Sequence, residues 1–397
     1  MSSGSARGPT RRQYITTTGT LIGAGTLAGC TSTGPESEED GNTGDGDDGG
    51  PHTATMSPVG TVEFDEVPES AFVAFPQYAD AAVALGHGDA VNTLFTPDLA
   101  GTTMNAYYER LPGVSFDYEG LTDPLAEGLS RERLLELDSD VHFIDPAYVV
   151  STDGWERSDV EDVAEQVGPW FGNYYSGTHA TPPSAYRDGY EYYDLWGVVE
   201  RVAAVFDETH RYEALASVHA DLLSTIESGL PPAEERPTVA RVSFMNDTFY
   251  ALKADAPGYW QADTRPLGAE DVFAGGEWNL WGTLDYEAML EVDPDVILNL
   301  WGTAPSYYVE DTRQTVANDP AGSKLSAIDN DRFYASGLRY QGPIMNLFQL
   351  EMTAKQLYPD QFGEWPGFPE GGPYPEFPES ERLFDRQRLA DVVAGEV

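Results

Sequence analysis

Short apolar runs alternate with amphipathic segments along most of the chain, a pattern typical of an α/β fold. Residues 71–75 are all apolar and fit a buried parallel strand, and residues 78–85 fit the helix that follows it. Apolar positions at helical spacing across residues 206–230 predict a long helix, capped by Asp207 and ended by Gly229. At 1.5 Å per residue this helix is roughly 30 Å long, enough to link two lobes. His219 lies on its apolar face, where we expect a packed core histidine.

One helix–turn–strand pattern occurs twice. Residues 131–144 and 286–299 each predict a helix, an Asp-x-Asp turn and a buried strand, in the same register. Aspartate side chains in such a turn can bond their own backbone, and Pro294 cannot continue a helix. The repetition predicts two related α/β lobes, at residues 58–205 and 235–365. We expect a single long rigid helix to join them, with a ligand cleft between the lobes.

A strand pair is predicted at residues 239–244 and 249–252, on either side of Asn246-Asp247-Thr248. That triplet also matches a glycosylation sequon, but we interpret it as a plain turn. Whether Asn246 carries a glycan is left open by the sequence.

The first thirty residues indicate export. Arg11 and Arg12 precede a weakly apolar stretch, which is typical of a twin-arginine signal, and Leu27-Ala28-Gly29-Cys30 matches a lipid-attachment box. A membrane-spanning anchor is the alternative, but residues 15–28 are too short and too rich in Thr and Gly to cross about 30 Å of hydrocarbon. We therefore expect a lipoprotein attached through Cys30 to the outer face of the cell membrane. Because Cys30 is the only cysteine, no internal disulfide can form.

Residues 31–57 are rich in Asp, Glu, Gly, Ser and Thr and predict a disordered acidic tether. A calcium loop is the alternative reading of the acidic cluster. In a frame that starts at Asp45, however, position twelve is Met56, where a calcium loop needs a glutamate. We therefore interpret this segment as a solvated tether.

The chain carries 67 acidic and 22 basic residues, with a formal net charge of -45. Such a charge opposes binding to nucleic acids. Its even spread fits a halophilic surface, since multimolar salt screens repulsion within about 3 Å. An acidic protein that folds at low salt is the less favoured alternative.

The sequence lacks the common catalytic motifs. No Gly-x-Ser-x-Gly, His-Glu-x-x-His, phosphate-binding loop or dinucleotide-binding glycine motif occurs, and the six histidines show no ligand-like spacing. We expect neither an enzyme nor a bound cofactor or metal.

Aromatic residues are the better indication of a site. Several follow the predicted carboxyl ends of strands, where open α/β sheets place their ligands. Arginines near them could bind anionic groups of a large, flat or chelated ligand. Core packing is the alternative role for each aromatic side chain. The candidate ligand-binding residues are Tyr78, Trp155, Trp170, Tyr174, Trp260, Arg265, Trp301, Arg339 and Tyr340.

The order of signal, tether, lobe, long helix and lobe resembles one class of binding proteins. Val67-Pro68 before the first strand, Ala84-Leu85-Gly86 after it, and residues 167–173 add to the likeness. Over roughly residues 60–360 the chain is similar to the long-helix substrate-binding proteins of ABC importers for ferric siderophores, haem and cobalamin. Residues 366–397, a Pro-rich tail and terminal helix, fall outside this resemblance.

The resemblance implies a monomeric receptor that captures an iron(III) chelate, foremost a ferric siderophore, and delivers it to a permease. Cobalamin and haem are the alternatives within the class. The resemblance also implies an exposed acid on each lobe that docks on the permease, and Glu156 and Glu310 match these positions. Outside the class, an exported surface hydrolase would need a convergent nucleophile and base, and a surface-layer protein would need β-sandwich repeats.

Overall fold

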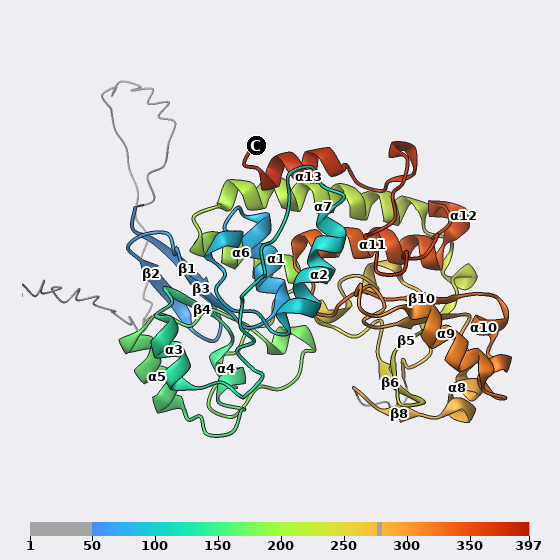
Figure 1. The fold of residues 1–397 in the computed structure, drawn as a ribbon, viewed down its shortest axis with the longest axis horizontal. Coiled ribbons are helices and arrows are strands. Elements are labelled where there is room, and N and C mark those ends of the chain that lie inside the picture. The colour runs from blue at the N-terminus through green and yellow to red at the C-terminus, as the bar shows by residue number, and fades with distance from the viewer. Residues whose placement is uncertain (1–49, 276–279, 397) are drawn as a thin grey trace, which may run out of the picture.

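The computed structural model describes residues 50–275 and 280–396, and two α/β lobes lie side by side along its long axis (Figure 1). The predicted signal, Cys30 and most of the predicted tether lie outside the described residues. Among the helices of the described part, none combines the length and apolarity that a membrane crossing requires.

The first lobe opens with an antiparallel hairpin of β1 (His52–Met56) and β2 (Gly60–Phe64), which packs on α6 (Leu195–Val205). β1 lies within residues 31–57, so the prediction of a tether to residue 57 was wrong for this strand. Ala54 and Met56 are buried while their neighbours face outward, a period-2 pattern too short to stand out beside the acidic segment.

The sheet of the first lobe is parallel. β3 (Ala71–Val73) pairs with β4 (Val141–Phe143), and single bridges add Val91 beside β3 and Trp170 beside β4. All of these strands therefore end at one edge of the sheet. The helices of this lobe are α1 (Pro76–Ala84), α2 (Pro97–Tyr108), α3 (Arg131–Leu137), α4 (Pro146–Val149), α5 (Arg157–Gln166) and α6.

The second lobe holds a mixed sheet with the strand order β10-β9-β5-β6-β8, and β7 also pairs with β5. Its strands are β5 (Thr238–Met245), β6 (Thr248–Leu252), β7 (Glu270–Asp271), β8 (Thr283–Leu284), β9 (Val296–Asn299) and β10 (Phe333–Ala335). Its helices are α8 (Tyr286–Val292), α9 (Val309–Asn318) and α10 (Ser326–Asp329). Side chains alternate across this sheet: Val239 and Leu298 join the main core, whereas Ala240 and Ile297 join a second cluster on the other face.

The predicted strand pair is confirmed as β5 and β6. Asn246 and Asp247 between them have φ of 50° and 56°, as a two-residue turn with two left-handed positions requires.

The repeated helix–turn–strand pattern is confirmed in both lobes. α3 ends at Asp138 and α8 ends at Asp293, both in the left-handed conformation, and β4 and β9 follow. The second aspartate of each turn holds the start of the neighbouring strand. Asp140 accepts hydrogen bonds from the backbone N–H and hydroxyl of Ser70, and Asp295 accepts the same pair from Thr238.

The predicted long helix forms as α7 (Thr209–Gly229), which carries the chain from α6 to β5. The prediction that Asp207 caps this helix was wrong, because Glu208 occupies the cap position and Asp207 has a φ of 57°. His219 packs as expected: its ring stacks on Trp196 at 4.3 Å, and burial lowers its pKa to about 4.

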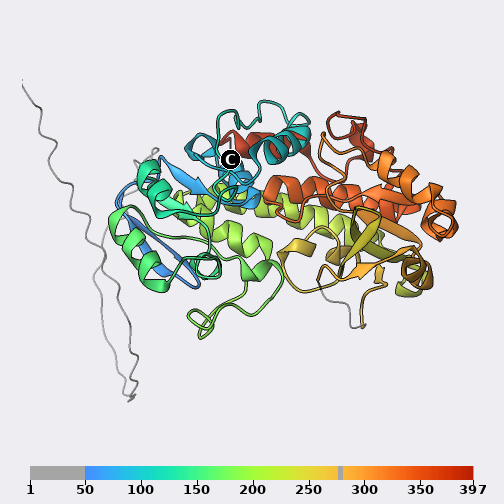
Figure 2. The same cartoon turned by 60° about the horizontal axis from the view of Figure 1, so that its bottom comes forward.

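A second helix, α11 (Pro343–Leu357), lies beside α7 and is buried along its whole length (Figure 2). Its first turn lies against the first lobe, where Asp80 accepts a hydrogen bond from the Met345 N–H at 3.1 Å. Its last carbonyls, at Gln356 and Leu357, accept hydrogen bonds from Arg332 of the second lobe. α11 therefore adds contacts between the lobes to the connection made by α7.

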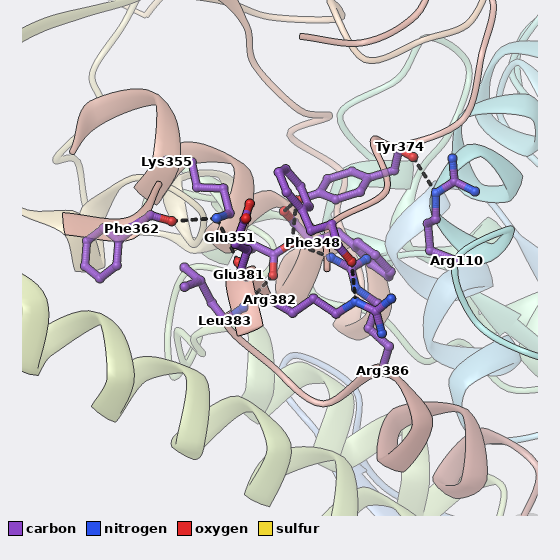
Figure 3. Close-up of polar contacts among 11 residues, drawn as sticks. Arg110, Phe348, Glu351, Lys355, Phe362, Tyr374, Glu381, Arg382, Leu383 and Arg386 are labelled. Atoms are coloured by element: carbon purple, nitrogen blue, oxygen red, sulfur yellow. Dashed lines mark hydrogen bonds and ion pairs between the residues drawn. The ribbon is translucent and has the colours of Figure 1, made fainter. Parts of the chain in front are cut away.

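The Pro-rich tail packs into the core (Figure 3). Tyr374 is fully buried, and its hydroxyl donates to Glu351 of α11 at 2.9 Å while its N–H donates to the Ala106 carbonyl of α2 at 2.8 Å. Arg386 forms a buried ion pair with the same Glu351. After α12 (Pro359–Phe362), the tail thus runs back to the first lobe, and its last helix α13 (Arg386–Val393) packs on α7.

Candidate functional site

Aromatic side chains from both lobes meet between them. Phe75 follows β3, and its ring stacks on that of Tyr340, which follows β10, with centroids 4.8 Å apart. Tyr174 of the first lobe packs edge-on against Trp260 of the second at 6.1 Å. The structure therefore brings together the candidates Tyr174, Trp260 and Tyr340, from loops that lie beyond strands of both lobes.

Four rings surround the Arg339 guanidinium. Its central carbon lies 4.7, 5.0, 5.1 and 4.6 Å from the ring centroids of Trp260, Trp281, Trp301 and Tyr340. We call these five residues the arginine box. Each ring face attracts the cation, by about 0.5–2 kcal/mol depending on exposure. The box fixes the guanidinium at the boundary between the lobes.

Arg339 lacks a carboxylate partner among residues 50–275 and 280–396. Its Nη2 donates to the Tyr340 hydroxyl at 3.2 Å, and its Nε is buried without an acceptor. The Trp260 Nε1 is a second buried donor in the box without an acceptor among those residues. Buried donors are nearly always satisfied in native proteins. The Arg339 Nε therefore suits a ligand that brings acceptor oxygens, whereas the Trp260 Nε1 lies against Gly177 of the first lobe.

The backbone of Trp281 and of Trp301 is strained. Trp281 and Trp301 have φ of 64° and 71°, a left-handed conformation that costs a bulky residue on the order of 1–3 kcal/mol. The Trp281 N–H donates to the Ala251 carbonyl, and the Trp301 carbonyl accepts from Ala304, each at 3.0 Å. These bonds hold both indoles against Arg339.

Two glycines allow the lobes to approach each other next to Trp260. A Cβ on Gly177 would lie 2.4 Å from the Trp260 Nε1, and one on Gly258 would lie 2.4 Å from the Gly177 carbonyl oxygen. Beside them, the Tyr259 hydroxyl donates to the Asn173 carbonyl of the first lobe at 3.3 Å. A side chain at residue 177 would therefore have to displace either the Trp260 indole or the lobe itself.

Asp145 holds Tyr174 in place. Its carboxylate accepts hydrogen bonds from the Tyr174 N–H at 2.8 Å and the Tyr190 hydroxyl at 2.6 Å, and it also caps α4. Burial raises its pKa to about 6, and these hydrogen bonds oppose the rise, so the group is charged at neutral pH. Burial, followed by the neighbouring Tyr340 hydroxyl, also raises the pKa of Tyr174, which keeps that phenol protonated.

Four candidates lie elsewhere. Trp155 and Trp170 pack together in the first lobe, and their indole N–H groups donate to the carbonyls of Leu129 and Val160. Tyr78 is buried in the same lobe, where its hydroxyl accepts from the Asn173 N–H. Arg265 is exposed on a short 3-10 helix.

The two docking candidates differ in their surroundings. Glu156 is exposed at the start of α5, beside an open hollow of about 470 Å³ lined by Arg131, Gly154, Trp155, Glu156 and Asp159. Glu310 is partly buried and pairs with Arg313 through two hydrogen bonds of 2.7 Å, which lower its pKa.

Several site residues are missing from the set predicted from sequence. Phe75, Tyr148, Trp281 and Asp145 all contribute. Asp145 lies two residues after β4 and Tyr148 lies in the short helix α4 that follows, so the rule about carboxyl ends of strands could have found them. Trp281 precedes its strand, and nothing in the local sequence indicates that it faces Arg339.

The described residues hold no group of three or more His, Cys, Asp or Glu side chains placed to bind a metal ion. His142 is fully buried in β4 and packs against Trp170 with tilted rings, and burial lowers its pKa to about 4. It is therefore a neutral core residue.

No family model and no curated protein matches the sequence. Among solved structures, the chain is similar to a periplasmic solute-binding protein from Veillonella parvula, with a TM-score of 0.55 and 14% identity over 79% of this chain and 88% of that one. The iron-uptake ABC transporter substrate-binding protein PiuA from Streptococcus pneumoniae matches with a TM-score of 0.52 and 15% identity, over 77% of this chain and 97% of that one.

The TroA-like periplasmic binding protein FepB from Veillonella parvula matches with a TM-score of 0.52 and 13% identity, over 79% of this chain and 91% of that one. The predicted two-lobed α/β fold is confirmed: it is the fold of TroA-like periplasmic solute-binding proteins. At these identities the likeness concerns the fold.

Proposed function

We propose that this chain, which shares the fold of TroA-like periplasmic solute-binding proteins, is the extracytoplasmic substrate-binding protein of an ABC importer. Its cargo is an anionic iron(III) chelate, foremost a ferric siderophore. The fold supports a substrate-binding role, and two structural neighbours are by name iron-uptake and TroA-like binding proteins. We propose no catalytic step.

The observation that carries the choice of cargo is the unpaired charge of Arg339. The chain has a net charge of -45, yet no described carboxylate pairs with this guanidinium. Placing an unpaired cation out of water is costly, so a ligand that supplies negative oxygens gains that pairing on binding. Arginine suits this role because its planar fork can bind two oxygens at once.

The rings around Arg339 complete the proposed site. The faces of Trp260, Trp281 and Trp301 offer apolar contact to a broad chelate, and the Tyr174 and Tyr340 hydroxyls can donate to its oxygens. The rings of Phe75 and Tyr340 touch across the lobes, so entry of a ligand requires these contacts to separate. Closing over the ligand would then exclude water and strengthen its pairing with Arg339.

Cobalamin or haem is the alternative cargo. The three indoles of the box offer far more ring surface than charge, which would also suit a flat macrocycle. Dependence of affinity on Arg339 separates an anionic chelate from cobalamin, since the chelate needs the guanidinium more than a corrinoid does. Haem carries two anionic propionates, so the titration itself must separate haem from the ferric chelates.

We further propose that Glu156 and Glu310 contact basic residues of the permease and that Cys30 tethers a monomeric receptor to the membrane. Glu156 is exposed, and among residues 50–275 and 280–396 no basic side chain forms an ion pair with it. Glu310 pairs with Arg313, so it must exchange this partner for a residue of the permease. Alanine at both positions should abolish uptake while leaving ligand affinity unchanged. Loss of affinity instead would contradict this assignment.

The test of the cargo is a fluorescence titration of the purified protein in multimolar KCl. Ferric tris-catecholates, ferric hydroxamates, haem and cobalamin are added in turn, with free tryptophan as the control for absorbance. Saturable quenching at micromolar or lower concentration by a ferric chelate is expected. No saturable response from the folded protein to any of the four would remove this function.

A further inference from the structure

A buried chain of polar side chains runs behind the arginine box. Arg241 of β5 donates to Asp263 at 3.0 Å, and Gln341 donates to the other oxygen of Asp263 at 3.0 Å. Asn346 of α11 donates to Gln341 at 2.9 Å, and Trp196 of α6 donates to Asn346 at 3.2 Å. We call these five residues the relay. It leads from the sheet of the second lobe to a helix of the first.

The relay holds both segments that build the box. Arg241 donates from its Nη1 to the Trp260 carbonyl at 2.8 Å, which fixes the backbone that carries this indole. Gln341 directly follows Arg339 and Tyr340 along the chain. Since both Arg241 and Gln341 bond to Asp263, this carboxylate ties the Trp260 segment to the Arg339 segment.

The relay is also balanced in charge. One oxygen of Asp263 pairs with Arg241 and the other accepts from Gln341, so the carboxylate is occupied on both sides. All three of these side chains are fully buried, where an unpaired carboxylate would be strongly destabilising. Arg241 thus neutralises the nearest acid of the Trp260 segment, and Arg339 keeps its charge for a ligand.

We infer that Asp263 and Gln341 are positioning residues of the ligand site, which set the placement of Trp260 and Arg339 without contacting the ligand. This inference rests on the proposed function, because it takes the arginine box as the binding site. A purely structural relay would stabilise the fold and leave affinity unchanged. The two roles predict different results for a change at Gln341.

The variant Gln341→Met keeps the length of the side chain and removes both of its hydrogen bonds. The first readout needs no ligand: the near-UV circular dichroism of the tryptophans. For each variant, the spectrum of the unsubstituted protein is subtracted. If Gln341 acts on the box, the difference spectrum of Gln341→Met should have the same shape as the difference spectrum of Arg339→Met. The matched control is Asn105→Leu, which removes a partly buried amide bonded to Phe116 of the first lobe and should leave this spectrum unchanged.

The second readout is a double-mutant cycle on the affinity for a ferric tris-catecholate. Gln341→Met should weaken binding about tenfold in the otherwise unchanged protein and hardly at all when Arg339 is already methionine. A structural role predicts equal effects in both backgrounds. Equal effects together with an unchanged near-UV spectrum would overturn the inference.

Gln341→Glu serves as a second variant if the methionine variant does not fold. Its carboxyl faces Asp263, so it can donate to that group only when protonated, with Arg241 beside them. Affinity should be low above neutral pH and recover toward the original value in mild acid. If Gln341→Glu and the unsubstituted protein bind the chelate with the same affinity at every pH, Gln341 does not position the site.

The two proposals fail separately. If no chelate binds but the near-UV spectra of Gln341→Met and Arg339→Met agree, the proposed cargo is wrong and the relay still orders the box. If Arg339→Met weakens binding of the chelate but Gln341→Met has equal effects in both backgrounds and leaves the near-UV spectrum unchanged, the site stands and the relay does not position it.

Discussion

The Phe75 ring of the first lobe stacks on the Tyr340 ring of the second, with centroids 4.8 Å apart, and Tyr340 is the residue after Arg339. The closest stacking between the lobes thus lies beside the unpaired guanidinium. Any separation of the lobes at this point must break this stack, which lies next to Arg339 in the chain. Ligand binding and lobe closure should be coupled through these two residues.

Replacing Arg339 by methionine should weaken binding of an anionic ferric chelate by at least about tenfold, since the ligand then loses its only charged partner in the box. Arg339→Lys should retain part of the affinity, because it keeps the charge and loses the planar fork. Arg133→Met on the exposed face of α3 is the matched control. Equal affinities for all four proteins in a calorimetric titration would contradict the assignment of the site.

Gly177→Ala should open the interface between the lobes. The new methyl group would lie 2.4 Å from the Trp260 Nε1, so either the indole or the lobe must move. We expect weaker binding and a larger radius of gyration by small-angle scattering. Gly197→Ala in α6 is the control, since its nearest contact is 3.1 Å to the Asp194 side chain, which caps the same helix and does not belong to the other lobe. Identical scattering from both variants would count against close apposition at residue 177.

The Pro-rich tail should contribute to global stability. Arg386→Met leaves Glu351 charged and buried, which should lower the free energy of unfolding by about 3–5 kcal/mol. Arg388→Met in the same helix removes an exposed pair with Asp221, and should cost less than about 1 kcal/mol. Chemical denaturation of both variants tests this, and similar midpoints would show that the tail is not part of the core.

Asp80 should make stability depend on pH. Burial raises its pKa from 3.8 to about 7, so between these values the folded protein holds a proton that the unfolded chain has lost. The contribution of Asp80 to stability is therefore greatest in acid and falls as pH rises from 4 to 7. Asp80→Asn should remove the contribution of Asp80 to the dependence of stability on pH. The variant also loses a hydrogen bond from Tyr108 or Met345.

Denaturation curves of the unsubstituted protein and Asp80→Asn across this range measure the difference. If the difference in the free energy of unfolding between the two proteins does not change with pH, the pKa of Asp80 is not raised by folding. Asp145 and Asp271 also have raised pKa values, of about 6, so the comparison must use the difference between the proteins and not the slope of either alone.

The sequence predicted those elements whose causes are local. The strand at β3, the two Asp-x-Asp turns and α7 follow from runs of apolar residues and from turn chemistry within a few positions. The packing of the tail depends on Glu351, which meets Tyr374 and Arg386 only in the folded chain. No local pattern encodes such a contact.

The same limit applies to the site. Trp301 follows the carboxyl end of β9, and the rule for open sheets selected it. Arg339 and Tyr340 follow β10, a strand that was not predicted from the sequence, and Arg339 was selected for its charge. Trp170 was also a candidate, yet it lies in the sheet of the first lobe, where it bridges to His142 and its side chain turns into the core. Arg241 is a charged residue inside an otherwise apolar strand, and only the folded structure identifies Asp263 as its partner.

The most direct test of the binding site is the position of iron in a crystal grown with a saturating ferric chelate. An anomalous difference map at the iron absorption edge locates the metal without reference to any sequence likeness. We predict one strong peak between the lobes, beside Arg339, Trp260 and Tyr174. A peak elsewhere, such as the hollow beside Trp155 and Glu156, would contradict the arginine box as the binding site.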